Sequence, residues 1–347
     1  MNKYLSSAVI MALCTALIPA GAVYFTKAPA AGDKPEQPAV SAVIPEGEMP
    51  EDTQQTVPSA SAYRVLDTST GLVSEVTVRD YIIGAAAAEM PATFEPEAIK
   101  AQMVAAHTYA ERQRLREQSS PTPQLCGADF SNDPAKYQGF FTDSQMQHYY
   151  GENYDAYYAK LSAAADEAER YILTYGGEPI IAAFHSISAG KTESAANAWG
   201  TYTPYLVPAD SSSDTAAPTY LEEKAFSRDL LAARLTKSFE GIELGDDFTE
   251  WIKVRTVSDS GTVMTASVGD TIASGNDIRE ALGLRSACFE IAYTADEAIF
   301  TTKGFGHGVG MSQYGANELA KAGGTWREIL SHYYTGCEIA ETVPPAQ

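Results

Sequence analysis

An uncharged apolar run near the N-terminus restricts which part of this 347-residue chain can fold as a globular domain. The run extends from Tyr4 to Phe25 and is long enough to cross a bilayer, which takes about 20 helical residues. We therefore expect residues 1–30 to be a transmembrane anchor with its N-terminus inside. A cleaved signal peptide is the alternative, because the letters APA at 28–30 resemble a cleavage site. Either reading places the remainder of the chain on the outer side of the cell membrane.

Residues 31–60 have a composition that does not favour folding. They contain five prolines, six acidic residues, one lysine and no aromatic residue. Such a stretch cannot bury enough apolar surface to offset the entropy lost on ordering it. We expect a disordered tether here, able to reach on the order of 90 Å when extended, followed by one folded region at 61–340.

Charge and cysteine content exclude two classes of protein. The formal net charge is −21 and no block of lysine and arginine is present, so the chain lacks the clustered cationic surface that nucleic acid requires.

Of the four cysteines, Cys14 lies in the apolar run, which leaves Cys126, Cys288 and Cys337. These three cysteines can form at most one intramolecular disulfide, so a scaffold held together by several disulfides is excluded. Whether Cys288 and Cys337 pair with each other is not decided by the sequence.

The pattern of apolar residues predicts an α+β fold with several β-hairpins and a helical region. We expect the substrate groove to lie in that helical region. Helices and strands come in clusters without regular βαβ alternation. Residues 119–151 are polar and rich in turn formers, and we expect a long surface excursion there. The expected helices are 78–90, 96–117, 154–170, 276–284, 313–322 and 326–334, and the expected strands are 63–67, 72–78, 171–175, 180–187, 251–257, 262–268, 288–293 and 298–303.

Glu89 is an acid at the end of an alanine run, in the sequence GAAAAEMP. Counting back by three, four and seven residues reaches Ala86, Ala85 and Ile82, so the carboxylate continues the apolar stripe of its helix. Desolvation and the nearby helix C-terminus both raise the pKa of such a carboxyl group. A protonated acid at neutral pH suits general acid catalysis. The alternative is a structural acid that is either paired with a basic residue or frayed into solvent at the helix end. Lys100, on the next helix, is the obvious partner under either reading.

A single acid restricts the chemistry. Ordinary glycosidases need two carboxyl groups about 5–10 Å apart, and residues 78–114 offer no second acid on an apolar stripe. One acid suffices where the substrate supplies its own nucleophile. The 6-hydroxyl of N-acetylmuramic acid in bacterial cell-wall glycan can do so once the glycosidic oxygen is protonated.

A glycine-rich stretch at 303–324 alternates glycine with bulky residues at 304, 306, 308 and 310. We expect these glycines to let the backbone approach a ligand, and Ser312 to cap the helix that follows. The stretch lacks the GK[ST] ending of a P-loop. Its His307 either faces a ligand or holds the turn.

A third motif, residues 184–200, follows an apolar strand with small and polar residues. His185 and Ser186 are adjacent on a strand-like segment and point to opposite faces, so a serine-hydrolase triad is disfavoured. Trp199 either stacks on a sugar ring or belongs to the core.

These motifs, in this order, resemble the stage II sporulation protein D family, which is shared with amidase-enhancer proteins. The resemblance covers most of residues 62–340, and GFGHGVGMSQYGANELAKAG is its most specific segment. It implies a membrane-anchored lytic transglycosylase that cuts peptide-free glycan strands and leaves 1,6-anhydro ends during engulfment in sporulation. It also implies a cell-wall amidase and other engulfment membrane proteins as partners.

The resemblance assigns Glu89 as the catalytic acid. It assigns substrate binding or support to Lys100, Gln102, His107, Ser186, Ser188, Lys191, Thr192, Glu193, His307, Ser312, Gln313 and Tyr314.

Two departures from the family pattern bear on chemistry. His107 replaces an arginine, so a fixed positive charge becomes titratable. Some relatives carry a zinc motif where this chain has Ser131, Lys136 and Tyr137, which are poor zinc ligands. We expect no metal and no cofactor.

Two other classes of function remain open. One is a glycan-binding protein that stimulates an amidase without cutting, and the other is a structural brace of the engulfing membrane. A pure enhancer would tolerate glutamine at position 89, whereas an enzyme would not.

Overall fold

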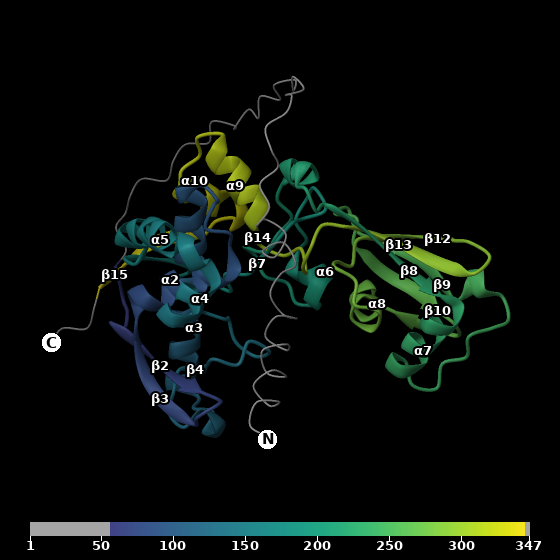
Figure 1. Ribbon diagram of the computed structural model, residues 1–347, viewed down its shortest axis with the longest axis horizontal. Coiled ribbons are helices and arrows are strands. Elements are labelled where there is room, and N and C mark those ends of the chain that lie inside the picture. The colour runs from purple at the N-terminus through teal and green to yellow at the C-terminus, as the bar shows by residue number, and fades with distance from the viewer. Residues whose placement is uncertain (1–55, 344–347) are drawn as a thin grey trace. The chain divides into compact units, whose positions relative to one another are not determined.

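The computed structural model describes residues 56–343 (Figure 1). The predicted anchor at 1–30 and most of the predicted tether lie outside the described residues. Between residues 56 and 343, none of the helices combines the length and the apolar character needed to cross a membrane. Helices and small sheets are mixed along this part of the chain, which confirms the α+β class.

The described chain divides into two compact units. The first comprises residues 56–181, 320–325 and 338–343, and the second comprises residues 182–319 and 326–337. The region predicted as one stretch at 61–340 therefore contains two units, and the chain passes between them more than once.

The first unit carries the N-terminal hairpin and the long helices. The four-stranded sheet β1-β15-β5-β6 contains one parallel pair, β1 with β15, and two antiparallel pairs. A second sheet has the order β3-β2-β4. Its elements are β1 (Thr56–Pro58), β2 (Ala62–Asp67), β3 (Leu72–Thr77), α2 (Val78–Glu89), α3 (Pro96–Ser119), β4 (Phe130–Ser131), α4 (Asp143–Tyr150), α5 (Tyr154–Ala168), β5 (Tyr171–Tyr175), β6 (Glu178–Pro179) and β15 (Glu338–Val343).

Local sequence explains where the first two helices begin. The Thr77 side chain accepts a hydrogen bond from the Asp80 amide, as expected for an N-cap. Pro96 occupies the first turn of α3, where its missing N–H costs nothing. Ile99, Met103 and Ala106 form a buried stripe on α3, and α3 packs against α2, α5 and β5.

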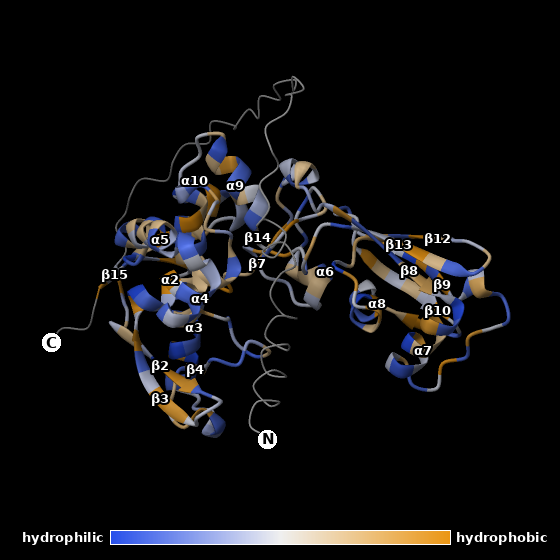
Figure 2. Cartoon of the chain, in the orientation of Figure 1, coloured by the Kyte–Doolittle hydropathy of each residue, from blue (hydrophilic) through white to orange (hydrophobic). Residues whose placement is uncertain are grey.

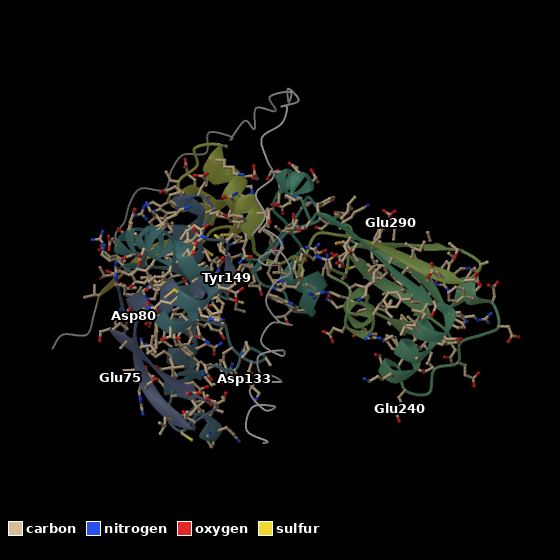
Figure 3. All side chains as sticks on the ribbon, viewed as in Figure 1. Glu75, Asp80, Asp133, Tyr149, Glu240 and Glu290 are labelled. Atoms are coloured by element: carbon tan, nitrogen blue, oxygen red, sulfur yellow. The ribbon has the colours of Figure 1, made fainter. Side chains whose placement is uncertain are left out.

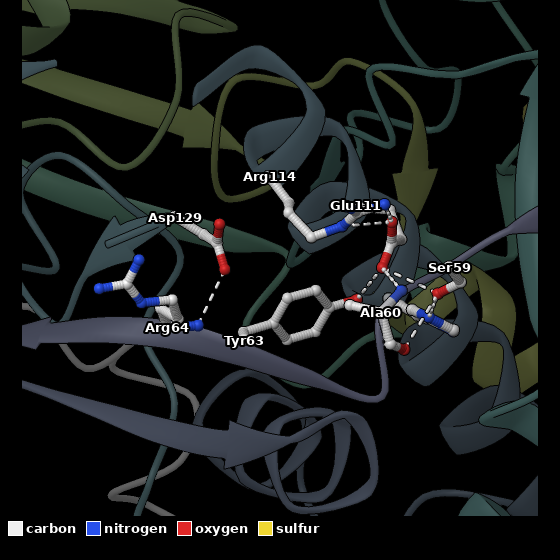
Figure 4. A network of polar contacts seen from close by, with 8 residues as sticks. Ser59, Ala60, Tyr63, Arg64, Glu111, Arg114 and Asp129 are labelled. Atoms are coloured by element: carbon white, nitrogen blue, oxygen red, sulfur yellow. Dashed lines mark hydrogen bonds and ion pairs between the residues drawn. The ribbon is translucent and has the colours of Figure 1, made fainter. Parts of the chain in front are cut away.

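The predicted C-terminal boundary of the tether at residue 60 is wrong, because ordered structure begins several residues earlier. Thr56–Pro58 form β1, which pairs in parallel with β15. Just after it, the Ser59 hydroxyl and the Ala60 amide donate hydrogen bonds of 2.8 and 3.1 Å to Oε1 of Glu111. Glu111 is 1% exposed and also accepts from Tyr63 and Arg114 (Figure 4). A buried carboxylate contributed by α3 therefore orders these residues, and local composition gives no sign of it.

The predicted surface excursion at 119–151 is also partly wrong. It contains β4 and α4, and α4 begins with a capping box between Thr142 and Gln145. The Phe141 amide donates to the Gly84 carbonyl at 3.0 Å, and a Cβ on Gly84 would lie 2.2 Å from the Phe141 carbonyl oxygen. The segment thus packs on α2 at a glycine, through a backbone contact that polar composition does not predict.

The second unit holds two three-stranded sheets, β11-β10-β9 and β12-β13-β8, and the short parallel pair β14-β7. Its elements are β7 (Phe184–His185), α6 (Ala195–Trp199), β8 (Leu221–Ser227), α7 (Arg228–Ser238), β9 (Ile252–Val257), β10 (Val263–Val268), β11 (Thr271–Ala273), α8 (Gly275–Leu282), β12 (Phe289–Tyr293), β13 (Glu297–Lys303), β14 (Met311–Ser312) and α10 (Trp326–Tyr333), while α9 (Gln313–Lys321) ends in the first unit.

One core lies between the two three-stranded sheets, α7 and α8. Its large members include Phe226, Trp251 and Phe300, and Figure 2 shows apolar residues along β10 and α8. The predicted strand at 180–187 is correct only at Phe184–His185, which pair with β14. The hairpin partner of β5 is instead β6, because an apolar run alone does not specify its pairing partner.

Candidate functional site

Glu89 is the last residue of α2. Its predicted neighbours on the stripe, Ile82, Ala85 and Ala86, are all at most 1% exposed. The Glu89 side chain itself is half-buried, and desolvation raises the pKa of its carboxyl group to about 7. Among the described residues, no hydrogen bond or ion pair reaches this carboxylate. The group is thus accessible from solvent and close to half protonated at neutral pH.

The loop after Glu89 is fixed from both sides. The Met90 amide donates to the Ala86 carbonyl at 2.9 Å and closes the helix. Lys160 of α5 donates to the Phe94 carbonyl, and burial lowers the pKa of its ammonium group. Sequence reasoning did not assign a role to Lys160, since a lysine in the middle of a helix gives no sign of the loop it contacts.

Lys100 is not the partner of Glu89. Its Nζ lies 2.8 Å from Glu97 and 2.7 Å from Glu167, so it links α3 to α5. The alternative in which Glu89 is a structural acid paired with Lys100 is therefore wrong. Without any substrate, the ammonium group of Lys100 already makes these two ion pairs.

Gln102 and His107 are both 0% exposed. Burial lowers the pKa of His107 to about 4, so the ring is neutral at physiological pH. Its Nε2 lies 3.4 Å from the Ser59 hydroxyl. These two residues face the interior of the first unit, so of the two predicted roles, binding or support, their burial favours support.

In the second unit, the two other motifs fold against each other. Met311 and Ser312 of β14 pair in parallel with Phe184 and His185 of β7. Further bridges join Ile187 to Phe305 and Glu193 to Val309. Sequence reasoning treated the motifs separately, but they form one structural element.

The alternating glycines serve this contact and not a ligand. All four have positive φ, from +72° to +111°. A Cβ on Gly304 would lie 2.6 Å from the Ile187 carbonyl oxygen, and one on Gly310 would lie 2.0 Å from that of Ala183. The prediction that these glycines open the backbone toward a ligand is therefore corrected, because their open side faces residues 183–193.

Asp214 is a buried acid that sequence reasoning missed. Its Oδ2 accepts from the Ser188 amide at 2.6 Å and from the Ser312 hydroxyl at 2.7 Å, and burial raises the pKa of its carboxyl group. The Ser211 hydroxyl donates to the same oxygen and contacts the Tyr333 hydroxyl at 2.8 Å. Ser312 also accepts from the Gly315 amide, which confirms its predicted capping role. Ser188 and Ser312 thus hold the fold together.

Thr192 and Glu193 are likewise buried. The Thr192 hydroxyl accepts from the Ala209 amide at 2.8 Å. Glu193 accepts from the Ser194 amide at 2.8 Å and from the Ser258 hydroxyl at 2.5 Å. These contacts are consistent with a role in supporting the site. Glu193 also lines a small pocket together with His307.

The motif residues that remain accessible in the second unit are few. Lys191 is exposed, Ser186 and His307 are half-buried, and Gln313 and Tyr314 are buried. His307 and Lys191 line a small pocket that also includes Cys288 and Lys303.

His307 holds the turn and also lies at this pocket. Its Nδ1 accepts from the Val309 amide at 3.0 Å, and burial lowers its pKa to about 4. Its ring lies 5.3 Å from that of Trp199 and 5.8 Å from that of His185. Trp199 is 44% exposed, so it is not an ordinary core residue.

The residues from 56 to 343 contain no cluster of three or more histidine, cysteine, aspartate or glutamate side chains that could hold a metal. Ser131, at one predicted zinc-motif position, is buried in β4. Cys126, Cys288 and Cys337 are free thiols, so Cys288 and Cys337 do not pair.

Comparison with known proteins identifies the family. The sequence profile described as "SpoIID: Stage II sporulation protein" matches residues 67–175, which include Glu89 and α3. The chain is 37% identical to the stage II sporulation protein D of Bacillus subtilis over 82% of this chain and 79% of the relative. It is 38% identical to the protein of the same name from Bacillus amyloliquefaciens, with the same coverage. A more distant similarity, 24% identity over 72% of this chain and 39% of the relative, is to the amidase enhancer of Bacillus subtilis. The chain therefore belongs to the stage II sporulation protein D family.

Proposed function

We propose that this protein is a lytic transglycosylase that cleaves peptide-free glycan strands of the cell wall. It would cut between N-acetylmuramic acid and N-acetylglucosamine and leave 1,6-anhydro ends. In this mechanism Glu89 protonates the glycosidic oxygen, and the bond between that oxygen and the anomeric carbon of muramic acid breaks, which releases N-acetylglucosamine with a free hydroxyl. The 6-hydroxyl of the same muramic acid bonds to the anomeric carbon in its place. The resulting carboxylate then takes the proton from that hydroxyl, so one group acts as acid and then as base.

The observation that carries this proposal is the state of Glu89. A general acid must be protonated at the working pH, must reach the substrate and must not be neutralised by a fixed cation. Glu89 has a pKa raised to about 7, is half-buried and has no ion-pair partner among the described residues. Membership of a sporulation family supports a role in remodelling the cell wall during engulfment.

The proposal includes a location and partners. Residues 1–30 would anchor the chain in the cell membrane, with the described units on the cell-wall side. An amidase that removes stem peptides would supply the substrate, and other engulfment membrane proteins would act beside it.

The test compares full-length wild-type protein with Glu89→Gln on purified peptide-free strands, with products read by mass spectrometry. We expect anhydro-muramic ends from wild type and a loss of at least about 100-fold in Glu89→Gln, because removal of a general acid typically costs 10²–10⁴ in rate. Glu75→Gln is the matched control, since Glu75 is an exposed carboxylate on β3 of the same unit (Figure 3). Equal cleavage by wild type and Glu89→Gln would refute the assignment.

A second function is favoured by one observation, the similarity to an amidase enhancer. A protein of that kind would bind strands and stimulate an amidase without cutting them. Strand binding with no anhydro product from wild type, and unchanged stimulation by Glu89→Gln, would establish it.

A further inference from the structure

A row of aromatic rings lies on the surface of the first unit, on the helices that pack against α2. Phe141, Tyr149, Tyr150 and Tyr157 follow one another with ring centroids 5.3, 5.2 and 5.2 Å apart. The three contacts are tilted or edge-to-face, with interplanar angles of 55° to 75°. We call these four residues the aromatic row.

One interior member of the row, Tyr149, is open to solvent. Tyr149 is 39% exposed, and Figure 3 shows its side chain on α4. Met146 is the only buried residue of α4, so this helix mostly faces solvent. Neighbouring rings on both sides hold Tyr149, and a large apolar face held in this way loses little entropy when a ligand packs on it.

The row is attached to the helix that carries Glu89. Phe141 donates its amide to the Gly84 carbonyl, and Gly84 has no room for a side chain against it. Gly84 precedes Glu89 by five residues, which is a rise of about 7.5 Å along α2. α4 packs on both α2 and α5. The Phe141 end of the row therefore packs on the helix that carries the proposed acid.

The row also contains an unsatisfied polar group. The Tyr150 hydroxyl is buried and has no hydrogen-bond partner among the described residues. Its neighbours Tyr149 and Tyr157 offer ring faces on either side. Buried hydroxyls without partners are uncommon in folded proteins, and each calls for an explanation.

We propose that the aromatic row is a glycan subsite, in which Tyr149 stacks against the apolar face of a pyranose ring close to the sugars that Glu89 acts on. A pyranose carries C–H groups on one face and hydroxyls at its edge, which matches an exposed tyrosine backed by further rings. The protein carries a formal net charge of −21, so its carboxyl-rich surface repels an anionic strand. Stacking needs no charge and provides affinity that is insensitive to that repulsion. This subsite rests on the proposed function, because it names how the same strand is held.

The experiment measures binding and not cleavage, so that its result does not depend on catalysis. Full-length Glu89→Gln protein is titrated with peptide-free glycan strands and, separately, with chito-oligosaccharides, which lack the lactyl carboxylate. We expect Tyr149→Ala in this background to weaken both affinities by about five- to tenfold, the range typical of one aromatic contact. Tyr149→Phe keeps the ring and should bind like the parent.

Two further variants keep the result interpretable. Tyr149→Leu preserves apolar packing against Phe141 and Tyr150 but has no aromatic face, so it should also lose affinity even if Tyr149→Ala folds poorly. Tyr175→Ala removes a tyrosine of β5 that is 43% exposed in the same unit, and it should leave affinity unchanged.

The subsite is refuted if folded Tyr149→Ala or Tyr149→Leu binds both glycans as tightly as the parent. A loss confined to the peptide-free strands would also refute stacking, because it would indicate recognition of the lactyl carboxylate. Absence of cleavage by wild-type protein would reject the proposed enzyme but would leave this binding result to stand by itself.

Discussion

At the scale of single residues, the fate of a charged side chain depends on which neighbours reach it. Lys100 and Glu89 lie eleven positions apart, yet Lys100 bonds to Glu97 and Glu167, and Glu89 has only desolvation acting on its pKa. Glu111 is more deeply buried than Glu89, but it accepts several hydrogen bonds and forms an ion pair with Arg114. The carboxylate of Glu111 therefore contributes to stability. The carboxylate of Glu89 is left available for chemistry at some cost in stability.

That cost predicts a pH-dependent effect of Glu89→Gln on stability. The pKa of Glu89 is raised in the folded state, so the wild-type side chain is accommodated best below its ordinary value of 4.5 and loses that stability as the pH rises through about 7. Glutamine does not titrate. We expect the variant to melt a few degrees higher than wild type at pH 8 and at about the same temperature at pH 5.

Thermal unfolding followed by circular dichroism at the two pH values tests this expectation. Glu75→Gln, at an exposed position, should show no such difference. A variant that melts lower than wild type at pH 8 would mean that Glu89 makes a stabilising contact after all.

At the scale of elements, the second unit is organised by the backbone contact between residues 183–193 and the glycine-rich loop. The glycines of this loop adopt positive φ and leave no space for a Cβ against the facing backbone. The buried Asp214 then links Ser188 of one segment to Ser312 of the other. These contacts explain why glycine alternates with bulky residues in the loop and why the segment that faces it is rich in small and polar residues.

Three glycine-to-alanine variants should separate close packing from backbone strain. Gly310, Gly308 and Gly261 have φ of +72°, +78° and +85°, so each variant pays a similar conformational cost of about 1 kcal/mol. An added Cβ would lie 2.0 Å from a neighbour at Gly310, 3.4 Å at Gly308 and more than 4 Å from any atom at Gly261. We expect losses in unfolding free energy of about 3 kcal/mol or more at Gly310, with Gly308 in between and Gly261 least affected.

Chemical denaturation of the three variants beside wild type gives this order directly. If Gly310→Ala and Gly261→Ala were equally stable, the close approach to the Ala183 carbonyl would not contribute to the stability of this unit.

At the scale of the whole molecule, both units bury neutral histidines. Burial lowers the pKa of His107 in the first unit to about 4, and the pKa values of His185 and His307 in the second to about 3 and 4. Unfolding returns these rings to water, where their ordinary pKa is about 6.5. Each unit therefore has its own sensitivity to acid.

We expect the contribution of these three histidines to stability to fall as the pH is lowered from 6.5 toward 4. At these rings the unfolded chain binds more protons than the folded chain in this window, so by linkage their contribution rises with pH, opposite in sign to that of Glu89. His107→Gln should flatten the dependence, and His148→Gln, at an exposed position, should not. Melting temperatures at pH 7 and pH 5 would show this, and parallel slopes for wild type and His107→Gln would contradict it.

Much of the fold is predictable from local sequence because the signals are local. Thr77 caps α2, Pro96 starts α3, and the alternating pattern of β9 and β10 forms the predicted hairpin. Short elements that depend on partners were missed or misplaced, such as β1, whose pairing strand lies almost 300 residues further along the chain. Polar composition likewise did not reveal α4, which packs on α2.

The sequence by itself determined that Glu89 lies on an apolar stripe at a helix end, because helical periodicity follows from spacing alone. Only the tertiary structure decided that Lys100 is occupied by other acids, that His107 and Gln102 are core residues, and that the alternating glycines face the protein's own backbone. It also brought Asp214 to the two serines and placed the aromatic row against α2. Burial and pairing arise from segments distant in sequence, so no local pattern contains them.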